Sequence, residues 1–383
     1  MQNLDYKKLL NFSKIEPIVK ENYTEKDILS GKLSEKDKTQ MIINKILENN
    51  GISAICKNII SNRSSSVYEF QLNGYSVKFQ KIKNLTDTFK MYLHTENVIV
   101  EQAKTFSGFS ISIGNKHKSI LTLGDCYHDK FSRTCVPIGV DIYNQTIETD
   151  LATLPHLMIC GSTGSGKSVC LNDLICSLLI NNKPEEVQFI LIDPKQVEFA
   201  PYRQLQNYCQ QGVISEVNIA SNLLSQLCSL MDRRYIDFQN KGVLDINSFN
   251  VKNSRYYKYY RIFVFIDELA DLMFLQRKEV ETPLCRLAQM GRAAGIHLVL
   301  ATQRPSREII TGILKVNIPA KICFKVPSTV NSRIVLDQNG AESLSGNGDG
   351  LWLNGKTTTP IRFQSPYIST TEIQRIVEEA KHC

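Results

Sequence analysis

The fold class can be inferred from the segment Gly161-Ser162-Thr163-Gly164-Ser165-Gly166-Lys167-Ser168. This segment fits the phosphate-binding pattern G-x-x-x-x-G-K-[ST]. The apolar run 157–160 leads into it, and residues 168–180 follow with helical spacing of apolar positions. In a strand, loop and helix of this kind, glycines let backbone N–H groups turn toward a phosphate, and the helix N-terminus adds positive potential. The stretch therefore predicts an α/β fold that binds a nucleotide.

The loop and the residue after it are expected to contact ATP, which makes a cofactor-binding set of Gly161, Ser162, Thr163, Gly164, Ser165, Gly166, Lys167, Ser168 and Val169. Within this set, Lys167 is expected to reach the β- and γ-phosphates, and Ser168 to bind Mg²⁺ through its hydroxyl. A phosphate loop alone does not separate ATPases from GTPases or nucleoside kinases. Further signals have to decide between them.

An acid pair supplies the second signal. The apolar run 261–266 ends at Asp267 and Glu268. Asp267 is expected to hold the Mg²⁺, and Glu268 to orient and activate the attacking water. A glutamate next to the metal-binding aspartate favours ATP hydrolysis over transfer of the phosphoryl group to a substrate. The sequence therefore predicts an ATPase in which Lys167 and Glu268 are catalytic.

Short apolar runs at 156–160, 187–192, 262–266 and 297–301 are typical of the buried parallel strands of an α/β sheet. Ligands bind at the carboxyl ends of such strands. Gln303, after the last run, is accordingly expected to lie beside the γ-phosphate. Asp193 and Lys195, after the second run, leave two interpretations open: they face the ligand, or they pair with each other as structural ions.

The sequence before this core divides into two further parts. Residues 1–55 are expected to form a helical lead-in, and residues 56–130 a small α+β domain. Within the latter, alternating residues at 67–72 and 75–79, joined by Asn73-Gly74, predict a β-hairpin; a helix at 85–93 and strands at 97–100 and 109–113 follow. Residues 131–383 form the predicted nucleotide-binding domain.

Composition bounds the class of protein. With 42% hydrophobic and 22% charged residues the chain is too apolar for intrinsic disorder, and its net charge of +7 permits a polyanionic partner without naming one. The 11 cysteines are scattered and include no C-x-x-C pair, which favours reduced, buried thiols in a cytoplasmic protein over a zinc site. No run approaches the roughly 20 apolar residues of a membrane span. Residues 250–261, which hold four tyrosines among basic residues, fit either a nucleic-acid patch or a solvated linker.

Several motifs in order give the chain a resemblance to the motor region of the FtsK/SpoIIIE family of double-stranded DNA translocases. They are Pro155-His156-Leu157, the loop 161–168, Asp193-Pro194-Lys195, the acid pair with residues 269–273, Arg286-Leu287-Ala288-Gln289, the block 292–306, Leu336-Asp337-Gln338, Gly340-Ala341-Glu342 and Gly348-Asp349. The resemblance covers roughly residues 135–370, and more weakly the small α+β domain, which looks like the family's α domain.

The resemblance implies a RecA-like P-loop NTPase core with a mostly parallel sheet, which acts as a ring, expected to be a hexamer, on double-stranded DNA with ATP held between subunits. By position, Lys167 and Ser168 would bind nucleotide and Mg²⁺, Asp267 and Glu268 would be the metal-binding and catalytic acids, and Gln303 would sense the γ-phosphate. Arg292 is the first choice for an arginine acting on a neighbouring subunit's ATP, and Arg333 the second.

The chain also departs from the family's pattern. We expect neither the membrane-spanning helices that typical members carry nor the C-terminal winged-helix domain of many members, because residues 368–383 are too few for its roughly 60 residues. The alternative to a DNA translocase is a coupling or packaging ATPase of a mobile element or phage, which works through a relaxase or portal partner. A third hypothesis is a scaffold that binds nucleotide without hydrolysing it. Lys315 is a candidate DNA contact.

Overall fold

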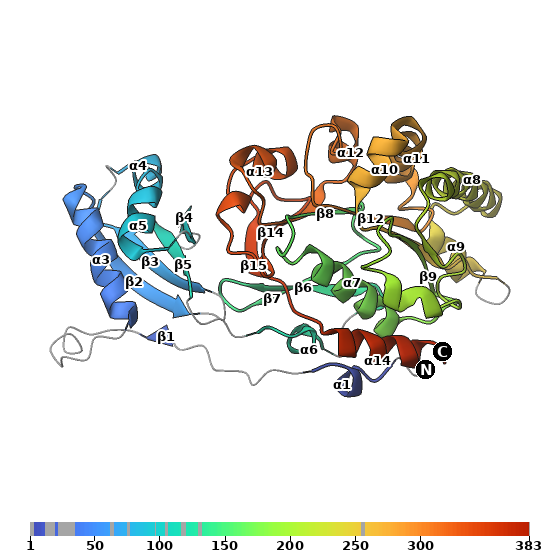
Figure 1. The fold of residues 1–383 in the computed structure, drawn as a ribbon, viewed down its shortest axis with the longest axis horizontal. Coiled ribbons are helices and arrows are strands. Elements are labelled where there is room, and N and C mark those ends of the chain that lie inside the picture. Colours follow the sequence, from blue (N-terminus) through green and yellow to red (C-terminus); the bar gives the residue numbers. More distant parts are fainter. Residues whose placement is uncertain are drawn as a thin grey trace.

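The computed structural model describes residues 4–11, 20–21, 35–61, 65–74, 77–95, 97–103, 106–115, 120–128, 132–253 and 257–382. In Figure 1 a smaller lobe, which holds β2 to β5, lies beside a larger lobe built on a second sheet. The two lobes correspond to the two sheets of the structure, one of five strands and one of ten.

The smaller lobe is an antiparallel sheet in the order β1-β2-β3-β5-β4, with helices packed on it. Its elements are β1 (Lys20–Glu21), α3 (Glu35–Asn49), β2 (Ala54–Ser61), β3 (Ser65–Leu72), α4 (Phe79–Lys83), α5 (Thr86–Leu93), β4 (Val98–Gln102) and β5 (Gly108–Gly114). Its core includes the rings of Phe70 and Phe109, which stack with centroids 5.3 Å apart. The helix and both strands expected after residue 84 are confirmed.

The expected hairpin at 67–79 is wrong. Its first strand exists as part of β3, but β3 pairs with β2 and β5 on its two sides, so both edges are taken. Val77 and Lys78 form no strand, and Phe79 begins α4; Tyr75 and Ser76 lie outside the described residues. Asn73-Gly74 therefore follows the end of β3 but is not the turn of a β-hairpin.

The larger lobe is a mixed sheet in the order β10-β9-β11-β12-β8-β13-β14-β15-β6-β7. The strands are β6 (Cys135–Asp141), β7 (Thr146–Asp150), β8 (Leu157–Cys160), β9 (Val187–Ile192), β10 (Val213–Ile214), β11 (Arg261–Ile266), β12 (Ile296–Thr302), β13 (Ala320–Phe324), β14 (Asp349–Asn354) and β15 (Ile361–Gln364). The pairs from β10 to β13 are parallel, and those from β13 to β7 are antiparallel. All four strands expected from apolar runs are present and lie side by side.

Helices cover both faces of this sheet (Figure 1). They are α1 (Tyr6–Leu9), α6 (Leu123–Cys126), α7 (Lys167–Asn181), α8 (Val217–Lys241), α9 (Ile246–Lys252), α10 (Leu269–Leu275), α11 (Arg277–Met290), α12 (Gly312–Asn317), α13 (Thr329–Leu336) and α14 (Thr370–Ala380), with 3₁₀ turns η1 (Ala200–Gln204) and η2 (Ala341–Ser343). Phe263 and Phe265 of β11 belong to the core under α7 and α14, whereas Val264 between them belongs to the core under α8 and α11. Burial on both faces is why these strands are continuously apolar.

The parallel register brings the carboxyl ends of the central strands to one edge of the sheet. Ile192 of β9 pairs with Ile266 of β11, and Thr302 of β12 pairs with Cys160 of β8. The residues that follow these strands therefore lie together, and these are the residues that the sequence singled out.

Among the described residues, two polar contacts join the lobes. The Tyr143 hydroxyl donates to Glu69 Oε1 at 2.9 Å, and Arg362 donates to the Ser112 hydroxyl at 2.8 Å. Arg362 is also bidentate to Asp349, with both side chains buried. The domain boundaries 1–55, 56–130 and 131–383 remain a proposal: α3 packs on the smaller sheet, whereas Leu9 and Leu10 lie in the core of the larger one.

The cysteines of the described residues are free thiols, and most are buried, including Cys160, Cys170, Cys176, Cys228 and Cys323. The expectation of buried, reduced thiols is thus confirmed for these positions. In the described part of the chain, no helix has both the length and the apolar character that crossing a bilayer requires.

Candidate active site

The loop between β8 and α7 has the backbone shape that its glycines predict. Gly164 and Gly166 take φ of 74° and 116°, values that favour glycine. A Cβ on Gly166 would also lie 2.7 Å from the backbone nitrogen of Gly348, so no other residue fits without a shift. The loop is followed directly by α7, which starts at Lys167.

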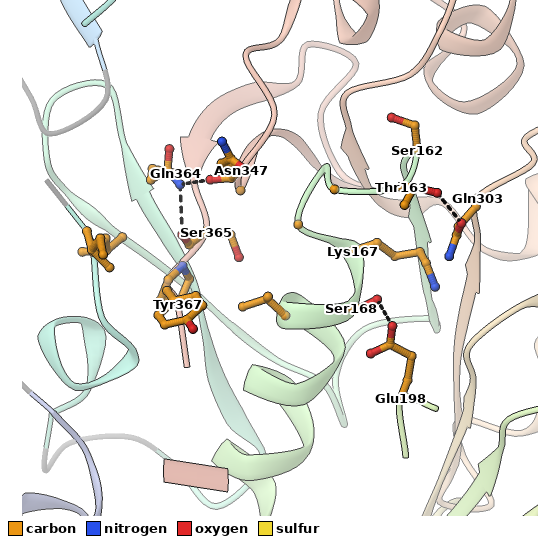
Figure 2. A pocket seen from close by; sticks show the side chains of 17 residues that line it. Ser162, Thr163, Lys167, Ser168, Glu198, Gln303, Asn347, Gln364, Ser365 and Tyr367 are labelled. Carbon is orange, nitrogen blue, oxygen red and sulfur yellow. Dashed lines mark hydrogen bonds between the residues drawn. The ribbon is translucent and has the colours of Figure 1, made fainter. Parts of the chain in front are cut away.

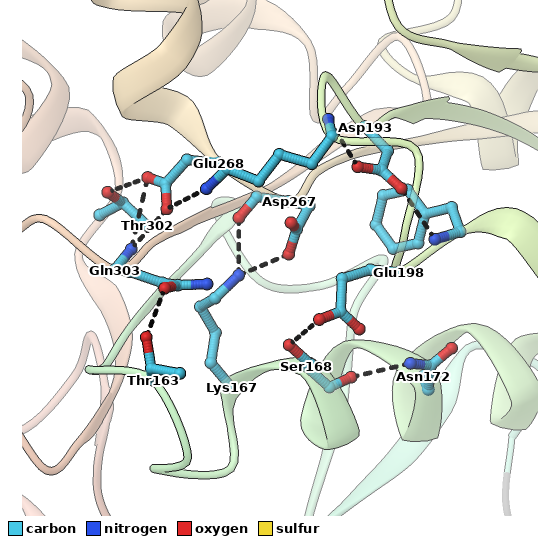
Figure 3. A network of polar contacts seen from close by, with 12 residues as sticks. Thr163, Lys167, Ser168, Asn172, Asp193, Glu198, Asp267, Glu268, Thr302 and Gln303 are labelled. Carbon is cyan, nitrogen blue, oxygen red and sulfur yellow. Dashed lines mark hydrogen bonds and ion pairs between the residues drawn. The ribbon is translucent and has the colours of Figure 1, made fainter. Parts of the chain in front are cut away.

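Lys167 lies at the floor of the site and is 2% exposed. Its Nζ donates to the backbone oxygen of Asp267 at 2.8 Å and to Oδ1 of the same residue at 2.5 Å (Figure 3). A buried ammonium without a partner would be strongly destabilising, and the Asp267 carboxylate compensates its charge. The phosphate-binding lysine and the first acid of the pair are therefore neighbours, although a hundred residues separate them.

Glu268 is buried, and its carboxylate is held from several directions. Oε1 accepts the Thr302 hydroxyl at 2.5 Å, and Oε2 accepts the backbone N–H of Gln303 at 3.0 Å. Oε1 also accepts the N–H of Ala270 at 3.3 Å, which caps α10. These bonds hold the carboxylate in one orientation, which is the arrangement that a general base would need.

Gln303 reaches the phosphate-binding loop from the next strand. Its Oε1 accepts the Thr163 hydroxyl at 3.0 Å, while its backbone N–H binds Glu268 (Figure 3). Gln303 thus connects the phosphate-binding loop to the second acid. The strand that carries it, β12, lies between β8 and β11, so the acids stand two strands away from the phosphate-binding loop.

Arg292 does not lie in this pocket. It is exposed and precedes β12, whereas Gln303 follows the same seven-residue strand. A strand of that length spans roughly 20 Å, so Arg292 is at the opposite edge of the sheet from its own chain's phosphate-binding loop. Arg333, the second choice, lies on α13 and donates to Asn339 at 2.7 Å.

The turn that carries Arg292 is rigid. Its next carbonyls are all bonded: Ala293 O accepts Ile246 N–H, and Ala294 O accepts Arg234 Nη1 at 2.6 Å. Arg234 is itself buried and lies 4.7 Å from the centre of the Tyr259 ring. Tyr259 of the basic-aromatic stretch therefore packs on a buried arginine, while the nucleic-acid patch and the solvated linker both remain predictions for residues 250–261.

A pocket of about 600 Å³ extends from the phosphate-binding loop toward the chain's C-terminal segment (Figure 2). Its far wall is formed by Ile120, Leu121, Pro366 and Tyr367, with Val169 on α7. One end thus offers N–H groups and an ammonium, and the other offers apolar surface, a division that suits a phosphate at one end and a planar base at the other.

Sequence reasoning missed two parts of this pocket. The apolar wall comes from segments far apart in the chain, and no motif marks it. Glu198 is the second part that the sequence motifs do not predict; its Oε1 accepts the Ser168 hydroxyl at 2.6 Å. An acid three residues after Lys195, in the loop that follows a central strand, was a signal that could have found it.

The donor set fits Mg²⁺. Ser168 places a hydroxyl at the pocket, the Asp267 carboxylate binds the Lys167 ammonium that lines it, and oxygen atoms are the ligands that this hard cation prefers. Within the described ranges no group of three or more His, Cys, Asp or Glu could hold a metal ion by itself.

Lys195 resolves the second open question. Its Nζ is 3.5 Å from Asp271 and 4.0 Å from Glu268, while the buried Asp193 carboxylate accepts backbone N–H groups of Lys195 and Phe199. The two side chains are therefore not an ion pair with each other. Asp193 shapes the loop, and Lys195 faces the acids of the site.

A glycine-rich loop between a central parallel strand and a helix, with an acid pair two strands away, defines a P-loop NTPase fold of the RecA-like type. The chain belongs to the FtsK/SpoIIIE family, whose model matches residues 123–307. The DNA translocase FtsK of Leptospira interrogans is 39% identical over 360 residues, which cover 91% of this chain and 38% of that protein. The DNA translocase FtsK of Caldanaerobacter subterraneus is 40% identical over 345 residues, covering 88% and 48%.

Solved structures agree with this fold. The pCW3 conjugation coupling protein TcpA, solved as a monomer with ATPγS, has a TM-score of 0.62 and 26% identity, and the match covers 90% of this chain and 99% of that chain. The cytoplasmic domain of the type VII secretion ATPase EccC from Thermomonospora curvata has a TM-score of 0.58 at 23% identity, covering 66% and 32%, and supports the fold alone.

Proposed function

We propose that the chain is an ATP-hydrolysing motor that moves along double-stranded DNA as a ring of identical subunits, with six as the expected number. The observation that carries this proposal is the set of polar contacts that joins the phosphate-binding loop to both acids: Lys167 binds Asp267, and Gln303 binds Thr163 and Glu268. The family relatives named DNA translocase FtsK support DNA as the track. Because the chain spans less than half of those relatives' length, the activity, substrate and partners are our proposal.

The described residues divide the work of hydrolysis. The N–H groups of the loop and the Lys167 ammonium would bind the phosphates of ATP, while Ser168 and Asp267 would hold Mg²⁺. The bound cation would neutralise charge on the phosphate oxygens. Glu268 takes the proton of the attacking water, since its carboxylate is fixed by Thr302 and by the Gln303 N–H. The Gln303 side chain, next to Thr163, orients the terminal phosphate and the water.

The position of Arg292 supports a ring. An exposed arginine at the sheet edge opposite to its own pocket can complete only the site of another subunit. Its rigid turn gives the side chain a defined base from which to reach a neighbour. An arginine supplied in this way raises the rate of hydrolysis by about 10³–10⁵-fold in P-loop enzymes. We therefore assign Arg292 to catalysis between subunits.

DNA binding is expected to be directed at phosphates and to weaken as salt rises. The net charge of +7 suits such a partner when copies of the chain surround it. Lys315 is not a free contact, because its Nζ binds Asp337 at 2.8 Å. A DNA phosphate would have to displace that carboxylate, so the residues that touch DNA must be found by experiment. The cytoplasmic location expected from the cysteines stays a prediction.

The test is an ATPase assay with and without duplex DNA in low salt, on the intact chain and on Lys167→Ala. We expect duplex to stimulate hydrolysis by the intact chain and Lys167→Ala to be inactive. Lys183→Ala, an exposed lysine just past α7, is the matched control and should behave as the intact chain. Equal hydrolysis by the intact chain and Lys167→Ala, or no response to duplex, would contradict the proposal.

A second candidate keeps the same chemistry and changes the partner. The structural match to a conjugation coupling protein over nearly the full length of both chains favours a coupling or packaging ATPase that works through a relaxase or portal protein. Dependence of hydrolysis on such a partner, tested by pull-down followed by an ATPase assay, separates this candidate from a motor that responds to naked duplex.

A scaffold that binds nucleotide without hydrolysis is disfavoured by Glu268. Its carboxylate accepts the N–H of Gln303, whose side chain contacts the phosphate-binding loop, and a scaffold would need no acid at that place. If Glu268→Gln kept full biological function, the scaffold would be favoured instead.

A further inference from the structure

The loop 193–199, which follows β9, is built to present two side chains to the active site. Asp193 closes it, because its buried carboxylate accepts the Lys195 N–H and the Phe199 N–H, both at 3.1 Å. Gln196 takes a left-handed φ of 59° between them. Asp193 itself follows Ile192, which pairs with Ile266 of β11, so the loop stands beside the acid pair.

Glu198 is the first of the two side chains that the loop presents. It lines the pocket, and its Oε1 accepts the Ser168 hydroxyl at 2.6 Å (Figure 3). A serine hydroxyl has one proton and two lone pairs. When the proton is committed to Glu198, the lone pairs point away from that carboxylate and stay available to a cation.

The arrangement around Ser168 is reinforced from the backbone side. Asn172 Nδ2 donates to the Ser168 carbonyl at 2.9 Å, and the Tyr202 hydroxyl donates to Asn172 Oδ1 at 2.6 Å. Tyr202 packs against Phe199, with ring centroids 6.4 Å apart, so the residue after Glu198 is anchored to the same network. Ser168 and Glu198 are therefore held relative to each other through α7 as well as directly.

We propose that Glu198 is a positioning residue for the metal site: it accepts the Ser168 proton and thereby aims the hydroxyl oxygen at the Mg²⁺ that accompanies the nucleotide. This inference rests on the proposed function, in which Ser168 is a metal ligand. Lys195, on the same loop, faces Glu268 and Asp271. One seven-residue loop thus contacts both the metal-binding hydroxyl and the carboxylate that takes the proton from water.

The quantity that reports this role is the preference for metal-bound nucleotide. Fluorescent mant-ADP is titrated onto the chain in excess MgCl₂ and in excess EDTA, and the ratio of the two dissociation constants is compared between variants. Residues that orient a metal ligand contribute roughly 10- to 100-fold in metal affinity. Glu198→Ala should therefore lower the Mg²⁺ preference by that factor and leave binding in EDTA nearly unchanged, and Glu198→Gln, whose amide oxygen still accepts the proton, should lose less.

The control and the double variant make the test specific. Glu185 is an exposed acid just before β9, and Glu185→Ala should keep the Mg²⁺ preference of the intact chain. Because Glu198 acts through Ser168, the double variant Ser168→Ala/Glu198→Ala should lose no more than Ser168→Ala alone. Equal weakening by Glu198→Ala in MgCl₂ and EDTA would indicate a merely structural role and overturn the inference, as would additive losses in the double variant.

The same titration separates this inference from the function on which it rests. If Ser168→Ala kept the Mg²⁺ preference, the proposed metal site itself would be wrong. If Ser168→Ala lost the preference and Glu198→Ala kept it, the metal site would stand and only the role of Glu198 would be refuted.

Discussion

Thr302→Val tests how Glu268 is held, because valine keeps the shape of the side chain and removes only the hydroxyl. The substitution removes the 2.5 Å bond to Glu268 Oε1 and the 3.1 Å bond that the hydroxyl accepts from the Arg304 N–H. Thr302 and Glu268 are both 1% exposed, so water cannot easily replace the bond to the carboxylate. A hydrogen bond to a charged group contributes about 1.5–3 kcal/mol. If the transition state loses that support, the rate falls by roughly 10- to 100-fold.

The assay is steady-state ATP hydrolysis with saturating duplex DNA, together with mant-ADP binding. Thr302 does not line the pocket, so we expect kcat to fall while the dissociation constant for nucleotide stays within about threefold. Thr302→Ser keeps the hydroxyl and should retain most of the activity. An unchanged kcat in Thr302→Val, or an equal loss in Thr302→Ser, would refute the claim that this bond holds the catalytic carboxylate.

Three further predictions concern the fold around the site. Burial lowers the pKa of His156 to about 4, below the unfolded value of about 6.5, so the free energy of unfolding should fall as pH drops through this window. Urea unfolding near pH 5.5 should therefore show a loss of about 1 kcal/mol. The loss should be smaller in His156→Asn, since asparagine tolerates the φ of 68° at this position. Gly166→Ala should abolish mant-ADP binding, because its Cβ would lie 2.7 Å from Gly348 N; retained affinity would contradict the loop geometry. Arg362→Met leaves the Asp349 carboxylate buried without its partner and should cost about 3–5 kcal/mol in denaturant unfolding, whereas a cost below 1 kcal/mol would show that the pair is relaxed by water.

The central sheet could be predicted because its strands are buried on both faces. Runs such as 187–192 and 262–266 contain no polar alternation, and the polar residues that follow them mark the edge where ligands bind. The register of parallel strands then brings Asp267 and Gln303 to the phosphate-binding loop. Local patterns and one topological rule were sufficient for this part of the site.

The parts that sequence reasoning missed depend on contacts between distant segments. The bond from Ser168 to Glu198 joins a helix to a loop thirty residues later. The position of Glu198 after a central strand indicates the edge where ligands bind, but it does not identify Ser168 as the partner. The apolar wall combines Leu121 with Tyr367, from opposite ends of the larger lobe's sequence. The hairpin prediction was wrong for a related reason: β3 pairs with β2 and β5, not with the residues that directly follow it.

In the proposed function, ATP hydrolysis at Glu268 drives movement along duplex DNA. Displacement of a third strand from a triplex at one end of a linear duplex measures this movement directly. The intact chain should displace the strand only when ATP and Mg²⁺ are present, and Glu268→Gln should bind the duplex without displacing it. Displacement by Glu268→Gln at the rate of the intact chain, or no displacement by an intact chain that hydrolyses ATP, would contradict the claim.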